Sequence, residues 1–518
     1  MNQIRPYKIM KKYITIIFVA LFLFLSACTN ESFLSDPIPN NEENFSIIPN
    51  VHDVERMYCD NGFCDFPDRF ESSLYSTFYF SEFIHNVTGE YPSSATNIKS
   101  FTSLRSMEIS DLWYFSNVYR DQVSSMKSFN SDISKIITDA LSSDFSASDL
   151  YMAQEISVIW YGKPWFNAKA LENQFLMLPT EDPIQVLINY YYLTKAYELY
   201  PVTNSNNLVY PDFLQCEESI KMLINTDKLP ITLLYEYLSV CDTLNINGCL
   251  NDNDIFAYVS RLETPNGAYG LFPGMGANAM PIYYASEIIN LRKLDVDLLP
   301  LVNQVSKLKR LDNTYIDYIE PSPDPRSTFY ALSILKLNDT DISSCANNYL
   351  KECTDNGIYP VLIAKISDIP INEAMISNGI HYLLSIPSDI MENINVQNQW
   401  LFLACELSDV IKNNNAAFHS YRDLLISKSK DIDTSIPENK YLLSLLYEKL
   451  DFKPDTPLDL PPDMISDSFI LVYLQKNASF SDFKFPDSIQ TSYYQIDNFS
   501  MENLFHYEYI SKFGKESK

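Results

Sequence analysis

One short stretch of charged residues carries the clearest catalytic chemistry that the chain can offer. Asp317, Glu320 and Asp324 lie close together, and Arg326 follows. Two carboxylates placed on either side of a sugar linkage are the groups that hydrolyse glycosides, one as an acid and one as a base or nucleophile. We therefore treat Asp317, Glu320 and Asp324 as candidate catalytic residues. A solvated loop that holds an Asp–Arg pair is the structural alternative.

The cysteines offer a second kind of chemistry. The chain has nine cysteines, and six of them form three close pairs. Such pairs oxidise in exported proteins, whereas in helical cores they stay reduced as small apolar side chains. The spacings are not those of zinc sites, and we expect no metal and no cofactor. The candidate disulfides are Cys59–Cys64, Cys241–Cys249 and Cys345–Cys353.

The first residues of the chain are typical of an export signal. Basic residues precede an apolar run from Ile14 to Leu25, which is too short to span a bilayer. The ending Leu25-Ser26-Ala27-Cys28 resembles the bacterial lipobox. That resemblance implies that Cys28 is acylated, with palmitate or a similar chain, and inserts into a lipid bilayer. The protein would then face outside the cytoplasm in the cell envelope, at the inner or the outer membrane.

The charge of the chain limits its partners. The formal net charge is -28, and residues 1–27 carry four basic residues and no acid, so residues 28–518 carry -32. A field of this sign repels phosphate groups and argues against nucleic acid as a partner. The charge does not exclude cations, glycans, peptides or other proteins as ligands. The sequence contains no G-x-S-x-G elbow, HExxH helix or phosphate-binding loop.

Composition divides the chain into three regions. Residues 1–27 form the lipoprotein signal peptide, 28–50 a polar tether, and 51–518 a single large helical domain. Residues after 453 form a subdomain of that body or a tail that packs on it. We expect an all-α fold, because strand-like alternation is rare and glycine is scarce. Helical spacing of apolar residues is clearest in 183–200, 282–294, 328–337, 400–411 and 440–450.

An internal repeat connects these helices. Gly62 precedes Glu82 by 20 residues, and Gly267 precedes Glu287 by the same interval. In both copies a loop with glycine and proline leads into a helix that carries adjacent aromatic residues. A third loop, rich in proline, leads into the helix of residues 328–337. Such periodic units predict a helical-repeat architecture.

The repeat unit resembles those of the prenyltransferase and terpene-cyclase superfamily, whose helical hairpins close into an α/α toroid. The resemblance implies an α/α toroid or a related helical repeat. In a toroid the loops before the repeat helices can face the central cavity, which would place Tyr269, Tyr315, Tyr318 and Arg326 beside the candidate acids as binding residues. The chain lacks the family's Asp-x-Asp-Asp run and its zinc ligands, so the resemblance implies no activity.

A second resemblance concerns the residues that follow Cys28. The segment 33–37 looks like the start of SusD-like glycan-binding lipoproteins. Because each catalytic motif lacks a residue, we expect a non-catalytic binding or scaffolding protein of the bacterial envelope. A glycan-active toroid enzyme that uses paired carboxylates and a SusD-like glycan receptor are the alternatives.

Overall fold

The structure is a computed structural model of the chain. It describes residues 51–95, 104–142, 145–179, 182–200, 213–246, 250–319, 322–355, 357–388, 390–453, 465–477 and 500–514. Cys28, Cys249 and Glu320 therefore lie outside the described residues, as do the predicted signal peptide and tether. Within the described residues, no helix combines the length and the apolar character that crossing a membrane requires.

The described residues form helices and one small hairpin, which confirms the prediction of an all-α, helical-repeat fold. The hairpin pairs β1 (Tyr58–Cys59) with β2 (Gly62–Phe63). The α-helices are α2 (Val51–Arg56), α3 (Leu74–Thr88), α4 (Ile109–Val118), α5 (Asn130–Ala140), α6 (Ala147–Tyr161), α7 (Ala168–Phe175), α8 (Pro183–Glu198), α9 (Phe213–Asn225), α10 (Ile231–Thr243), α11 (Asp252–Leu262), α12 (Ala279–Arg292), α13 (Leu299–Ser306), α14 (Pro325–Leu337), α15 (Ser343–Glu352), α16 (Tyr359–Ile366), α17 (Glu373–Ser385), α18 (Ile394–Lys412), α19 (Asn415–Lys428), α20 (Pro437–Lys449), α21 (Ser468–Asn477) and α22 (Met501–Phe513).

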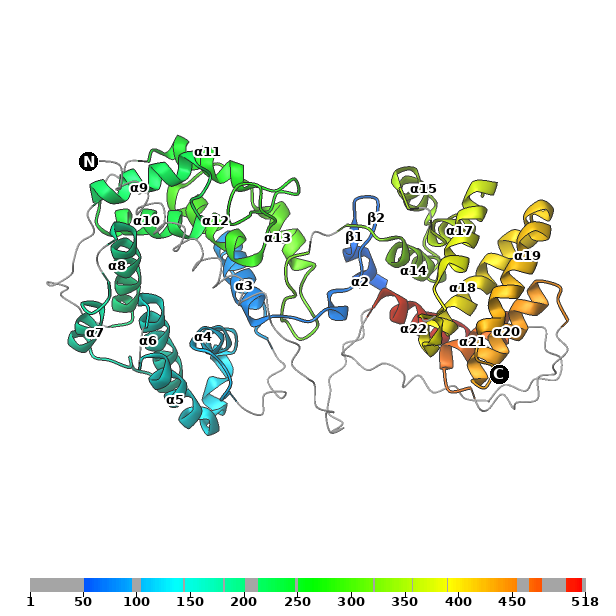
Figure 1. Ribbon diagram of the computed structural model, residues 1–518, viewed down its shortest axis with the longest axis horizontal. Helices are drawn as coiled ribbons and strands as arrows, with labels where there is room; N and C mark the ends of the chain where they lie inside the picture. Colours follow the sequence, from blue (N-terminus) through cyan, green and yellow to red (C-terminus); the bar gives the residue numbers. More distant parts are fainter. Residues whose placement is uncertain are drawn as a thin grey trace, which may run out of the picture. The chain divides into compact units, whose positions relative to one another are not determined.

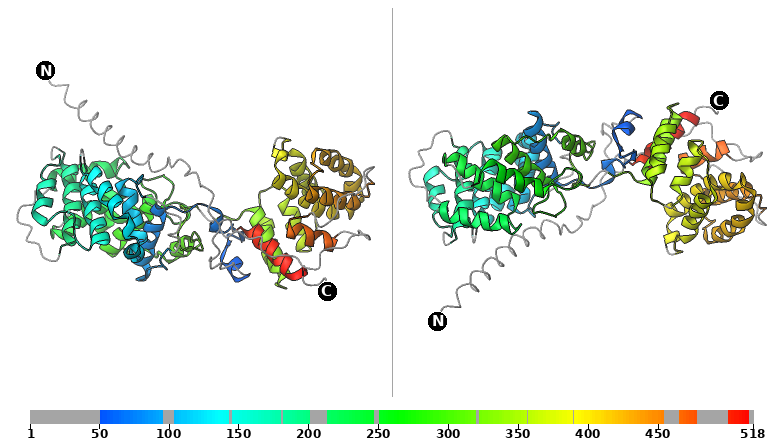
Figure 2. Two further views of the ribbon diagram at one scale, coloured as in Figure 1. Left: turned by 90° about the horizontal axis from the view of Figure 1, so that it is seen from below. Right: turned by 90° about the horizontal axis from the view of Figure 1, so that it is seen from above.

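Six helices pack on one another in a closed circuit, which we call circuit A. The order is α3, α4, α6, α8, α10, α12 and back to α3. The helices that alternate with them in the sequence, α5, α7, α9, α11 and α13, are drawn on the outer side of the circuit (Figures 1 and 2). Apolar clusters fill the space between the two layers, for example among α4, α5 and α6 and among α6, α7 and α8. Whether this circuit is the α/α toroid of the resembling superfamily stays a prediction.

A second closed circuit, circuit B, follows in the sequence. The order is α14, α16, α18, α20, α21, α22 and back to α14, while α15, α17 and α19 pack on members of this set. Helices α21 and α22, which follow the proline-rich stretch, complete the circuit and share one apolar core with the rest of it. Of the residues after 453, those of α21 and α22 thus pack on the helices before them.

The ends of the circuit helices carry the expected capping chemistry. Ser73 at the start of α3 accepts a hydrogen bond from the Ser76 amide, and Asn278 accepts one from the Met280 amide at the start of α12. These side chains satisfy amides that have no partner inside the helix. Local sequence therefore helps to set where α3 and α12 begin, whereas α4 and α10 begin without a side-chain cap.

Candidate functional site

An unbroken chain of aromatic contacts joins the six helices of circuit A. Every neighbouring pair of helices contributes at least one contact, and in the six that follow the ring centroids are 5.3 to 6.4 Å apart. We call the residues involved, together with Tyr283, the aromatic lining. The contacts are Tyr79–Tyr114, Trp113–Tyr151, Tyr151–Tyr192, Tyr191–Tyr235, Tyr235–Tyr284 and Tyr284–Tyr79.

Adjacent aromatic residues explain how one helix contacts both of its neighbours. Consecutive side chains on a helix diverge by about 100°, since one turn takes 3.6 residues. On α8, Tyr192 accordingly meets Tyr151 of α6, while Tyr191 meets Tyr235 of α10. The pair Trp113-Tyr114 does the same on α4, toward α6 and α3. The dipeptides thus link the circuit in both directions.

The aromatic lining keeps contact with water. Tyr192, Tyr283 and Tyr284 are only half-buried. No hydrogen bond joins the hydroxyl of Tyr192 or Tyr284 to another residue in the part of the chain that the structure describes. Burial raises the pKa of both phenols well above the ordinary value, so they stay neutral. A ligand inside circuit A would therefore find uncommitted hydroxyl groups and aromatic faces.

Glu236 is the most unusual polar residue of circuit A. It lies on α10 next to Tyr235, and only 8% of its surface is exposed. No described residue forms a hydrogen bond or an ion pair with its carboxyl group. Burial alone raises the pKa of Glu236 to about 8, so the group is mainly protonated at neutral pH. Its electrostatic neighbours are the phenols of Tyr191, Tyr192 and Tyr284.

Further glutamates surround the aromatic lining. Glu287 on α12 accepts a hydrogen bond from Tyr235, at 3.0 Å, and one from Asn86. Glu82 on α3 accepts one from Tyr91, and burial raises the pKa of Glu82. No ion pair joins either carboxylate to a basic side chain within the described ranges. The interior of circuit A is consequently acidic and has little neutralising charge.

Two basic side chains near the aromatic lining already have partners. Arg120 pairs with Glu155 at 3.1 Å, and Glu155 also accepts the indole N–H of Trp113 at 2.6 Å. Lys195 pairs with Glu198 at 3.3 Å. Both pairs lie around the aromatic lining and leave Glu236 without a counter-ion.

In circuit B, unlike circuit A, two neighbouring acidic residues form ion pairs with lysines. The Lys365 ammonium lies 2.7 Å from Glu406 and 3.0 Å from Asp409, and Lys449 lies 2.6 Å from the second oxygen of Asp409. Tyr473 donates to the other oxygen of Glu406 at 2.6 Å. Glu406 and Asp409 of circuit B are thus neutralised by the protein's own lysines.

The Arg326 side chain repeats this arrangement at the other side of circuit B. Arg326 forms an ion pair with Glu502 of α22, and Tyr330 donates to the same carboxylate at 2.6 Å. The pKa of Glu502 is lowered, despite its burial, by the neighbouring positive groups His506 and Arg326. Arg326 therefore has a structural partner, Glu502 of α22, in place of the loop aspartate of the structural alternative.

A pocket of about 380 Å³ lies where α14 begins. Asp324, Arg326, Tyr359 and Tyr382 line it with Pro325, Asp355 and Gln399. Asp324 accepts a hydrogen bond from the Ser327 amide at 2.8 Å and so caps α14. Two of the seven candidate residues predicted from the sequence thus line one pocket, although Asp324 serves there as a helix cap.

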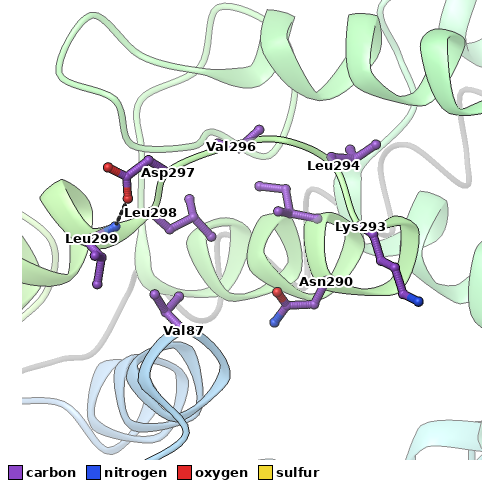
Figure 3. A pocket seen from close by; sticks show the side chains of 9 residues that line it. Val87, Asn290, Lys293, Leu294, Val296, Asp297, Leu298 and Leu299 are labelled. Carbon is purple, nitrogen blue, oxygen red and sulfur yellow. Dashed lines mark hydrogen bonds between the residues drawn. The ribbon is translucent and has the colours of Figure 1, made fainter.

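A second pocket, of about 420 Å³, lies between α3 and the loop that joins α12 to α13 (Figure 3). Its apolar side chains are those of Val87, Ile289, Leu294, Val296, Leu298 and Leu299. The polar residues Asn290, Lys293 and Asp297 lie around them, and Asp297 accepts a hydrogen bond from the Leu299 amide. The exposed lining of this pocket is more polar than apolar, and no described residue of the aromatic lining reaches it.

The other predicted site residues hold loops together. Asp317 accepts hydrogen bonds from Ser73 and Ser76 at 2.8 and 2.6 Å and so braces the start of α3. Tyr269 and Tyr315 are buried in short bridged loops. Tyr318 donates to Gln304 at 3.1 Å. None of these four lines the pocket with Asp324, and Glu320 lies outside the described residues.

The predicted disulfides divide into three cases. Cys59 of the hairpin and Cys64 just after it are free thiols, and the Cys64 thiol donates to the Met57 carbonyl at 3.3 Å, so this disulfide stays a prediction. Cys345 and Cys353 are free thiols eight residues apart, at the two ends of α15. A helix rises about 12 Å over that interval, beyond the roughly 7 Å that a disulfide bridges. The third pair includes Cys249, which is outside the described residues.

Sequence reasoning missed Glu236 and the aromatic lining as a site. The repeat contained part of the signal, because its aromatic residues and glutamates are Tyr79 with Glu82 on α3 and Tyr283 and Tyr284 with Glu287 on α12. These residues lie together in circuit A, where α3 packs on α12. The repeat therefore includes side chains of the candidate site as well as the pattern of the fold.

Comparisons with protein-family models, with curated proteins and with solved structures return no match. The proposals below accordingly rest on the chemistry of the described residues.

Proposed function

We propose that the protein is a lipid-anchored, exported binding protein of the bacterial envelope that holds a small ligand inside circuit A. The observation that carries the proposal is the closed aromatic lining around an unpartnered carboxylic acid, Glu236. Ligand sites are typically lined by aromatic groups with a few polar groups among them. Acylated Cys28 would hold the protein at the bilayer.

The surroundings of Glu236 favour binding over hydrolysis. Two-carboxylate hydrolysis needs a second acid about 5–10 Å from the first, and two such close carboxylates repel each other and shift each other's pKa. The pKa of Glu236 is raised by burial, with no contribution from another acid. Asp317 and Asp324, the acids predicted to be catalytic, are both engaged in holding helix starts.

A retention experiment tests the proposal. The purified protein is incubated with the low-molecular-weight fraction of an envelope extract, filtered, and analysed by mass spectrometry for retained compounds. We expect retention by the wild type and its loss in Tyr284→Leu, which removes a hydroxyl and an aromatic face from circuit A. The matched control is Tyr382→Leu, which alters the pocket at α14 and should retain the compound.

The outcomes separate the alternatives. Equal retention by wild type and Tyr284→Leu, or no retention by either, would contradict the proposal. Loss in Tyr382→Leu alone would move the site to the pocket at α14. A retained compound recovered unchanged after prolonged incubation supports binding without catalysis.

One observation favours a second candidate, the glycan-active enzyme. Glu236 is protonated near neutral pH, which is the state that a general acid requires. For this candidate, incubation with glycans releases shorter products, and Glu236→Gln abolishes that release. Glycans recovered at full length from the wild type count against it.

A further inference from the structure

We propose that the ligand of circuit A is an organic cation, a substituted ammonium group that lies among the tyrosine faces with Glu236 as its counter-ion. This inference rests on the proposed function and specifies the chemical class of the ligand. A cation of this kind has an apolar, polarisable surface and one positive charge, and both properties have a match inside circuit A.

The first match is the unpartnered acid. Glu236 is more than nine-tenths buried, and no described residue bonds to its carboxyl group. A buried polar group without a partner costs stability, whereas a buried charge is tolerated when an opposite charge sits beside it. A bound cation would supply that charge and convert the protonated acid into a carboxylate.

The second match is the aromatic lining. Glu236 faces Tyr191 and Tyr192 from α8 and Tyr284 from α12. Tyrosine faces attract ammonium groups through the ring quadrupole, and the attraction is stronger when water is excluded. Because Tyr192 and Tyr284 are half-buried, part of their surface remains open for contact with a ligand.

The third match is the charge around the lining. The acids that face this region from the neighbouring helices are Glu287 on α12, Glu82 on α3 and Asp149 on α6. The basic residues Arg120 and Lys195 are paired with their own glutamates, as described above. A cation therefore enters a region of negative potential, and an anion is repelled from it.

Circuit B provides an internal comparison. Inside it Glu406 contacts Lys365 and Glu502 contacts Arg326, so these two partly buried acids have a cation from the protein itself. The buried Glu438 of α20 instead accepts hydrogen bonds from Ser466 and the Asp467 amide. Inside circuit A the corresponding partner of Glu236 is missing among the described residues. In circuit B a lysine and an arginine of the protein thus pair with Glu406 and Glu502. In circuit A no described basic residue pairs with Glu236, so an external cation can take that place.

The arrangement favours an organic cation over a metal ion. Metal ions such as Ca²⁺ take six to eight oxygen ligands at 2.3–2.6 Å, mostly from several clustered acids. No three His, Cys, Asp or Glu side chains gather around one point in the described part of the chain. A single carboxylate with aromatic neighbours suits an ammonium group instead.

Binding is coupled to a proton. The O–H bond of the Glu236 carboxyl breaks as the cation enters, the proton passes to the buffer, and the carboxylate remains beside the cation. Affinity should rise by up to tenfold per pH unit below the pKa of about 8 and level off above it. One proton should be released per cation bound near pH 6.

A pair of probes of equal shape tests the inference. Choline carries a trimethylammonium group, and 3,3-dimethyl-1-butanol is its uncharged counterpart. Calorimetric titration of each into the full chain, in two buffers of different ionisation enthalpy, yields affinity and protons released. We expect choline to bind at least tenfold more tightly than the alcohol, with release of a proton.

Two substitutions complete the test. Glu236→Gln should lower choline affinity at least tenfold and abolish proton release, while its thermal stability shows that the variant is folded. Glu218→Gln, an exposed acid on the adjacent α9, is the matched control and should bind as the wild type does.

Each contrary result has a defined meaning. Equal affinity for choline and the alcohol, no choline binding, or unchanged binding by Glu236→Gln would overturn the inference. If a neutral compound is still retained and still lost in Tyr284→Leu, the proposed binding function survives without the cation. If Tyr284→Leu changes nothing either, both proposals fail.

Discussion

At the scale of residues, the central feature is a carboxylic acid that the fold does not neutralise. Glu236 is buried on α10, and the shift of its pKa comes from burial alone. Such groups are concentrated at functional sites, because a fold keeps an unfavourable group where its chemistry is needed. The paired acids of circuit B show that this chain neutralises a buried carboxylate elsewhere.

The pH dependence of stability follows from this residue. Between about pH 4.5 and 8 the unfolded chain loses the Glu236 proton and the folded protein keeps it. Stability therefore falls as pH rises, by about 1.4 kcal/mol per pH unit from this group. Glu236→Gln lacks this loss, so its stability relative to the wild type should grow from pH 4.5 to pH 8.

Urea unfolding at pH 4, 6 and 8 measures the effect. Glu218→Gln serves as the control, because an exposed acid should follow the wild type at each pH. A Glu236→Gln curve that runs parallel to the wild type over this range would show that Glu236 is ionised in the folded protein.

Residue types alone favoured a different place from the one that we propose. Asp317 and Asp324 drew attention because acids in a loop beside an arginine look available for catalysis, yet both accept hydrogen bonds that hold helix starts. Glu236 was not selected from the sequence, because a single acid in an apolar helix forms no recognisable motif. Only the packing of α8, α10 and α12 shows that it lacks a partner.

At the scale of elements, the sequence predicted the helices better than it predicted the site residues. The helical periodicity of 183–200 and 282–294 corresponds to α8 and α12, and the loop-plus-helix repeat corresponds to α3 and α12. Local signals suffice for such features, because capping and apolar spacing are local. The closing of the two circuits depends on contacts between residues far apart in the chain. The repeat predicted a helical-repeat architecture but not which helices close each circuit.

The helices of circuit B should depend on their internal lysines. Lys365→Met would leave Glu406 and Asp409 partly buried without one of their cations. Removal of one partner from a buried pair costs about 3 kcal/mol or more. We expect a clear loss of stability in urea unfolding, and unchanged ligand retention.

An exposed pair is the appropriate comparison. Lys412 and Asp451 also form an ion pair, but both side chains are about half exposed or more. Lys412→Met should cost less than about 1 kcal/mol. If the two substitutions cost the same, the ion pairs inside circuit B are no more important than those at the surface.

At the scale of the whole molecule, the proposals concern location and charge. The acidic composition, with a net charge of -28, suits a protein that collects cations and avoids nucleic acid. The anchor at Cys28 lies outside the described residues and rests on the lipobox resemblance. Location and binding are separate claims, so each needs its own test.

Cys28→Ala tests the anchor. The variant should move from the membrane fraction to the soluble fraction, because the acyl chains would be its only attachment. Cys59→Ala, which alters another cysteine, should stay with the membranes. A Cys28→Ala protein that remains membrane-bound after a salt wash would contradict lipid anchoring at this residue.

The ionisation state of Glu236, with and without a cation, tests the account most directly. Carbon-detected NMR of protein with labelled glutamate, assigned by difference from Glu236→Gln, reports that state. The account predicts a protonated carboxyl at pH 7 that becomes ionised when choline is added. A carboxylate already ionised without choline, or a signal that choline leaves unchanged, would contradict it.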